Sequence, residues 1–107
     1  MIYMQATIEL KAGGLQRFSD TLKIIIPIVE SAGWHLVAAI MQSTGRLYTA
    51  IDVWRMPDLN TYANGRNALR LHERWPEISA ALVDVVERET VVLGTQADWL
   101  PDGRMEA

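Results

Sequence analysis

The sequence predicts an α+β domain in which a four-stranded antiparallel sheet carries helices on one face. Three observations lead to this fold. Apolar residues alternate in some segments and recur every three or four residues in others, so both strands and helices are expected. The order of these segments is β-α-β-β-α-α-β, and 107 residues provide one core rather than two. The segments within 34–55 are too apolar to lie open to water.

The first strand and the first helix have contrasting periods. At positions 2–10 apolar residues alternate with more polar ones, which predicts a strand with one apolar face. That face comprises Ile2, Met4, Ala6, Ile8 and Leu10, and the other comprises Tyr3, Gln5, Thr7 and Glu9. Helical spacing then predicts a helix over 15–32, which Gly33 ends. Pro27 lies inside this helix and removes a backbone hydrogen bond, so we expect a kink or a split there.

The remaining elements follow from turn and cap signals. Positions 34–42 and 47–55 are predicted as strands joined by a tight turn, Ser-Thr-Gly-Arg. Asp58 is placed to cap a helix that begins near position 59 and that Gly65 weakens. Trp75-Pro76 marks a break, and the proline suits the first turn of a third helix. The β-branched run at 90–93 predicts the last strand.

These elements fit the ferredoxin-like, or split βαβ, arrangement. We assign residues 1–95 to this α+β barrel domain and residues 96–107 to a C-terminal arm or tail. The fold covers one sheet face with its own helices and leaves the other bare. On the third strand the more apolar side is Ile51 and Val53, which leaves Asp52 and Trp54 on the bare side. A second copy would close that side, so the sequence predicts a homodimer, a dimeric α+β barrel.

Composition excludes several classes of partner. The formal charge is −3 and no run of Lys or Arg occurs, so neither nucleic acid nor a membrane surface is expected as a partner. The chain has no cysteine, which removes thiolate chemistry. The longest apolar run, 36–41, is too short to span a bilayer, and the amino terminus lacks the zones of a signal peptide. We therefore expect a cytoplasmic protein.

Asp52 is the leading candidate for a catalytic group. Its apolar neighbours along the strand and nearby Trp54 predict a desolvated carboxylate of raised pKa, which suits a general acid or base. The alternative is a structural carboxylate that pairs with a cross-strand or partner arginine, or that accepts hydrogen bonds from Tyr and Trp. His35 is a second candidate proton carrier, and the alternative is a satisfied polar group at a strand end. His72 can line the cavity mouth or simply complement a helix dipole. The histidines and acids do not have metal-ligand spacing, so no metal is expected.

Candidate ligand-binding residues surround this acid. Tyr3, Tyr48 and Trp54 are aromatic residues with polar atoms, suited either to lining a pocket or to packing at a dimer interface. Gln5 joins this set from the uncovered face of the first strand. Arg66, with Arg70 four residues later, can bind an anionic substrate, or can instead lie on a solvated helix face.

A family resemblance rests on the order and spacing of short motifs along positions 2–93. They include Gly13-Gly14 before a helix with Phe18, Pro27 late in that helix, Gly33, Gly45, Val53-Trp54-Arg55, Asp58-Leu59, Arg66 and Trp75. The sequence resembles the NIPSNAP-like branch of the dimeric α+β barrel superfamily. The resemblance implies a dimeric barrel with an interior cavity, and the wider superfamily includes cofactor-independent monooxygenases, isomerases and haem-degrading enzymes. The family often carries a histidine where this chain has Asp52.

The functional hypothesis follows from the cavity and the acid. We expect a homodimer that binds a hydrophobic, cyclic metabolite and, as an enzyme, works by proton transfer without a cofactor: an isomerase, cyclase or monooxygenase. One alternative is a non-catalytic interaction or structural domain whose sheet face is only a dimer interface. Another is haem bound between helix and sheet.

Overall fold

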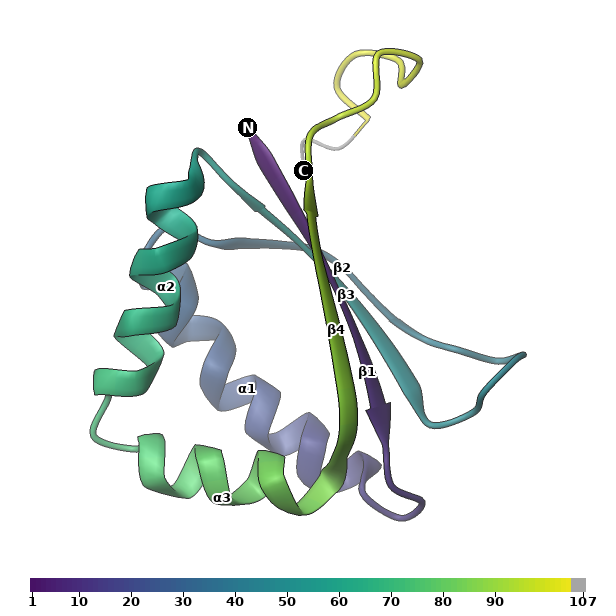
Figure 1. Ribbon diagram of the computed structural model, residues 1–107, viewed down its shortest axis with the longest axis vertical. Coiled ribbons are helices and arrows are strands. Elements are labelled where there is room, and N and C mark those ends of the chain that lie inside the picture. Colours follow the sequence, from purple (N-terminus) through teal and green to yellow (C-terminus); the bar gives the residue numbers. More distant parts are fainter. Residues whose placement is uncertain (105–107) are drawn as a thin grey trace.

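The computed structural model describes residues 1–104 as four strands and three helices in the predicted order (Figure 1). The elements are β1 (Ile2–Leu10), α1 (Leu15–Ser31), β2 (His35–Met41), β3 (Thr49–Met56), α2 (Leu59–Leu71), α3 (Trp75–Val85) and β4 (Val86–Gly94). The strand order is β2-β3-β1-β4 and every neighbouring pair is antiparallel. The ferredoxin-like prediction is confirmed.

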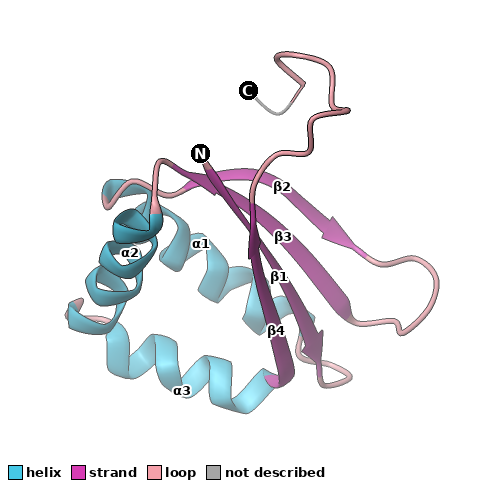
Figure 2. Ribbon diagram, turned by 45° about the horizontal axis from the view of Figure 1, so that its top comes forward, coloured by secondary structure: helices cyan, strands magenta, loops and turns pink. Residues whose placement is uncertain are grey.

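All three helices lie on the same side of the sheet (Figure 2). Against them β1 buries the predicted face, Met4, Ala6, Ile8 and Leu10, each no more than 5% exposed. Apolar residues of α1 and α3 complete this core, among them Val29 and Ile78. The helices shield one sheet face. The opposite face, here called the open face, has none of the described helices on it.

The predicted orientation of β3 is wrong. Asp52 and Trp54 point toward the helices, where they pair across the sheet with buried Ala6 and Met4. Ile51 and Val53 point to the open face instead. Alternation defines the two sides of a strand but not which one is buried. Two large residues at the even positions, Trp54 and Met56, determine the choice because both are almost fully buried.

β2 and the loop after it also depart from the prediction. A bulge between Leu36 and Ala38 shifts the register with β3, so alternation from position 34 does not hold along the strand. The two strands are joined by a longer loop than the predicted tight turn, because β2 ends at Met41 and β3 begins only at Thr49. Tyr48 ends the loop with a φ of 60° and accepts a hydrogen bond at its carbonyl from the Leu10 N–H at 2.8 Å.

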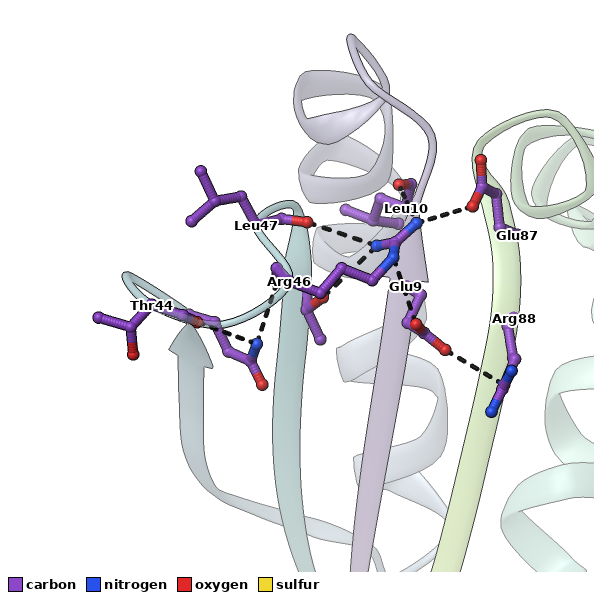
Figure 3. Close-up of polar contacts among 9 residues, drawn as sticks. Glu9, Leu10, Thr44, Arg46, Leu47, Glu87 and Arg88 are labelled. Carbon is purple, nitrogen blue, oxygen red and sulfur yellow. Dashed lines mark hydrogen bonds and ion pairs between the residues drawn. The ribbon is translucent and has the colours of Figure 1, made fainter.

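Arg46 attaches this loop to the neighbouring strands (Figure 3). Its guanidinium lies 2.7 Å from Glu87 of β4 and 3.3 Å from Glu9 of β1. It also donates to the Leu10 carbonyl at 3.3 Å. Arg88 reaches the other oxygen of Glu9 at 3.2 Å, so two arginines and two carboxylates alternate across this end of the sheet. The network holds the loop against β1 and β4 although β2 and β3 form the hairpin.

The helices largely follow their sequence signals. Gly33 ends α1 with a φ of 107°, and the Asp58 carboxylate caps α2 by accepting from the Thr61 N–H at 2.8 Å. Pro27 does not split α1, which continues for one more turn to Ser31. α3 passes directly into β4, because Val85 ends one and Val86 begins the other. β4 is therefore longer than the predicted 90–93. Residues 105–107 of the predicted tail lie outside the described residues.

Gly65 has a structural purpose that the sequence alone does not show. The Trp34 indole packs against the α2 backbone there, and a Cβ on Gly65 would lie 2.1 Å from Trp34 Nε1. The same nitrogen donates to the Thr61 carbonyl at 2.9 Å. Tyr62 stacks on the indole at 5.8 Å and Trp54 meets it edge-on at 5.4 Å. The contact joins α2 to the sheet.

Gly65→Ala is expected to destabilise the protein although alanine favours helices by about 1 kcal/mol. The added methyl group would displace Trp34 and break its hydrogen bond, which we expect to cost about 2–3 kcal/mol net. Urea unfolding followed by circular dichroism measures the change. Asn64→Ala, at the preceding exposed position, is the control. Equal or greater stability of Gly65→Ala would contradict the close contact.

Candidate active site

A cavity of about 240 Å³ lies between the sheet and the three helices. Ala6, Ile8, Asp52, Trp54 and Glu89 line it from the sheet. Leu22, Arg66, Leu69, Arg70 and Trp75 line it from the helices. Most of these side chains are apolar, while the ionisable ones are two acids on strands and two arginines on α2. The cavity thus combines a hydrophobic interior with groups able to move protons or bind an anion.

Asp52 is the buried acid of this cavity. It is 7% exposed, and no described residue donates a hydrogen bond to its carboxylate or forms an ion pair with it. Burial raises the pKa of Asp52 to about 6, and the negative charge of Glu89 adds to the rise. Within residues 1–104 of the single chain, Asp52 has no cross-strand arginine and no Tyr or Trp donor; pairing with a partner arginine stays an untested alternative. A carboxylate with this pKa is mostly ionised at pH 7 yet basic enough to accept a proton.

Glu89 belongs to the cavity but was not predicted. It pairs with Ile8 on β1, so its side chain shares the helix-covered face with Asp52. The predicted strand began one residue later, because Val-Glu-Arg-Glu after a helix offers no β signal. Glu89 lies two positions before Val91, so the two side chains share one side of the strand, and Val91 also lines the cavity. This spacing could have identified Glu89 from the sequence.

The two arginines come from successive turns of α2. Arg66 donates to the Tyr62 hydroxyl at 3.1 Å and its guanidinium lies 5.9 Å from the centre of that ring. Arg70 donates to the Asn67 side chain at 2.6 Å. Among the described residues neither arginine forms an ion pair with a carboxylate. Both side chains are exposed, as on the solvated helix face that was the alternative, and both also line the cavity, so binding of an anionic group by Arg66 stays a prediction.

Other predicted ligand-binding residues lie elsewhere. Tyr3 and Gln5 point to the open face, where they line a separate hollow of about 400 Å³ with Trp99 and Leu100 of the C-terminal arm. The Tyr3 hydroxyl lies 3.4 Å from the Gln96 side chain. Tyr48 is in the β2–β3 loop and lines none of the cavities described here. The structure therefore does not bring these three together with Asp52.

Neither histidine lines the Asp52 cavity. His35 pairs with Arg55 on the open face, and its Nδ1 lies 3.8 Å from a Glu30 carboxylate oxygen. His72 caps the end of α2, where its Nδ1 accepts from the Arg74 N–H at 3.1 Å. The cavity consequently offers no imidazole either as a second proton carrier beside Asp52 or as a ligand to haem iron.

A second hollow meets this cavity from the other side of α1. This α1–β2 groove of about 250 Å³ lies between the helix and β2, with Phe18, Ile26 and Met41 among its walls. Asp52 and Leu22 line both the groove and the cavity. The acid is thus reached from two sides of one helix.

Across residues 1–104 no three His, Cys, Asp or Glu side chains come together as a metal site. Within the same residues no helix has the length and hydropathy needed to cross a bilayer.

The topology and the cavity beneath its helices define a ferredoxin-like α+β protein. The NIPSNAP family model matches residues 3–101, so the chain belongs to the NIPSNAP family. A search of curated proteins finds no match.

Solved structures share this fold. A NIPSNAP family protein of unknown function from Agrobacterium tumefaciens is 22% identical and superposes with a TM-score of 0.80 over 94% of this chain and 92% of that one. An uncharacterised NIPSNAP domain protein from Burkholderia xenovorans is 21% identical, with a TM-score of 0.79 over 95% and 100%. A putative antibiotic biosynthesis monooxygenase from Caulobacter crescentus is 9% identical, with a TM-score of 0.71 over 91% and 90%. At these identities the similarity concerns the fold alone.

Asp52→Asn is expected to stabilise the protein at pH 8 more than at pH 4. The pKa of Asp52 is raised in the folded state, so the folded protein holds the proton more tightly and stability falls as pH rises from about 3.8 to about 6. Above pH 6 this cost reaches up to about 3 kcal/mol, which the neutral amide avoids.

Urea unfolding at both pH values measures this difference between the variant and the original protein. The control, Asp98→Asn, replaces an exposed carboxylate and should change stability by less than about 0.5 kcal/mol. An equal effect of Asp52→Asn at pH 4 and pH 8 would show that the carboxylate is not desolvated.

Proposed function

We propose that this protein is a cofactor-independent enzyme that moves a proton on a hydrophobic, cyclic metabolite, with Asp52 as the catalytic base. The single observation that carries the proposal is a largely buried acid that has no partner among the described residues and lines an apolar cavity. Such a group costs stability, and active sites are where costly, perturbed carboxylates concentrate.

The cavity favours a particular kind of substrate. Trp54 and Trp75 provide aromatic walls for a ring, while Arg66 and Arg70 offer positive charge to an acidic substituent. A carbon acid held between them would lose a proton to Asp52 and form an enolate. Return of the proton at another carbon completes an isomerisation. The same first step would open a cyclisation or, with dioxygen as co-substrate, an oxygenation.

Hydrogen–deuterium exchange tests the proton-transfer step. Enolisable cyclic acids that bind are first identified by native mass spectrometry, and their exchange in D2O is then followed by NMR. Asp52→Asn should retain binding but lose about 10²–10⁴-fold in the exchange rate, the usual contribution of a general base.

The control for that experiment is Asp20→Asn, which removes an exposed acid on α1 that bonds only Gln16 among the described residues. Undiminished exchange in Asp52→Asn would remove Asp52 from the mechanism. Failure of every acid to bind would favour the alternative, a non-catalytic interaction domain.

We also propose that the working form is a homodimer joined through the open face. Two rows of side chains cross the middle of this face: Ala38, Val53, Gln5 and Val92, then Ile40, Ile51, Thr7 and Thr90. Ile40 and Val92 are 52% and 57% exposed in the single chain. A second copy with the same apolar centre would bury both sets of side chains.

Val53→Glu is expected to produce a monomer at micromolar concentrations, because it would bury an unpaired charge at the centre of the interface. Sedimentation equilibrium measures the change, which should exceed 100-fold in the dissociation constant. Val83→Glu is the matched control, since Val83 is 75% exposed on α3, away from the open face. A monomeric original protein, or a Val53→Glu dimer of unchanged affinity, would contradict this interface.

A further inference from the structure

The α1–β2 groove has no assigned role in proton transfer, yet it reaches the same carboxylate. We propose that it is the tail subsite of the Asp52 cavity, so that the ligand is a cyclic acid bearing an aliphatic chain. This inference rests on the proposed function, because it places the ring and the acidic group in the cavity. The chain would leave the cavity at Asp52 and pass beneath α1.

Continuity is the first argument for this subsite. Leu22 and Asp52 are shared walls of the cavity and the groove, whose volumes are about 240 and 250 Å³. Leu22 projects from α1 and is only partly buried, so it forms the boundary between the two spaces. A ligand that places a reacting carbon at Asp52 therefore lies next to both spaces, with Leu22 between them.

The chemistry of the groove is the second argument. Its walls are Phe18, Leu22 and Ile26 on α1 and Leu36, Ala39 and Met41 on β2. Met41 is 41% exposed, so the chain's own described residues leave it partly uncovered. Such walls can bind an aliphatic chain but offer little to a polar one. The groove is about as large as the cavity, so it has room for an alkyl chain of several carbons.

Charge gives the ligand its direction. Arg66 and Arg70 line the cavity and not the groove, so the acidic substituent belongs at the cavity end. The groove has one cationic residue, Lys23, which is exposed at its edge. The two arginines thus select the head of the ligand, and the groove selects the length of its tail.

A series of 4-alkylbenzoic acids, from propyl to decyl, tests the proposal with the intact protein. Binding is followed by quenching of tryptophan fluorescence, because Trp34, Trp54 and Trp75 line the cavity. Affinity should rise about fourfold with each methylene that enters the groove and level off once the chain is longer than the groove. Arg66→Ala should weaken every member of the series by a similar factor and leave the dependence on length intact.

Two variants locate the tail. Ala39→Phe fills the groove from the exposed surface of β2 and should abolish the dependence on length while short acids still bind. Ala80→Phe, at an exposed position of α3 that lines none of the described cavities, should leave it unchanged. Short acids that bind in an Arg66-dependent way without any gain from longer tails would overturn the tail subsite alone. If no acid binds, the proposed function fails with it.

Discussion

The packing of Trp34 on α2 is the contact on which the arrangement of the cavity depends. The indole occupies the space that a side chain at Gly65 would take and donates to the carbonyl of Thr61. Without it, α2 makes few contacts with the sheet, because only its one glycine is fully buried. Arg66 and Arg70 follow directly along the same helix. Trp34 therefore determines where these charges lie relative to Asp52.

Asp52 shows how stability and function oppose each other in a small domain. A buried carboxylate without a partner is unfavourable, and a nearby second acid, Glu89, makes it more so. The rest of the fold must offset this energy through ordinary apolar burial. Arginines lie in the same cavity, yet no described ion pair neutralises Asp52. The protonation state of Asp52 is therefore expected to change readily when a ligand in the cavity gives or takes a proton.

Much of the fold could be predicted because its signals are local. The β1 alternation, the Asp58 cap and the left-handed Gly33 each depend on a few neighbouring residues. The orientation of β3 could not be predicted in this way, because Ile51 and Val53 are individually more hydrophobic than Ala50 and Asp52. The orientation of β3 depends instead on the packing of Trp54 against Trp34, which lies just before β2 and is distant in the sequence. For the candidate site, the sequence names Asp52, Trp54 and Arg66, which line one cavity, but it groups Tyr3 and Gln5 with them and misses Glu89.

The alternation of β3 has a consequence for how the family can diversify. Even positions of this strand face the cavity and odd positions face the opposite surface, within a single run of eight residues. A substitution at 52 can therefore alter the chemistry of the cavity without changing the other surface, and one at 51 or 53 can do the reverse. Substitutions can thus vary the cavity and the open face independently on one strand, whereas a one-residue insertion there would exchange the two sets of side chains at once.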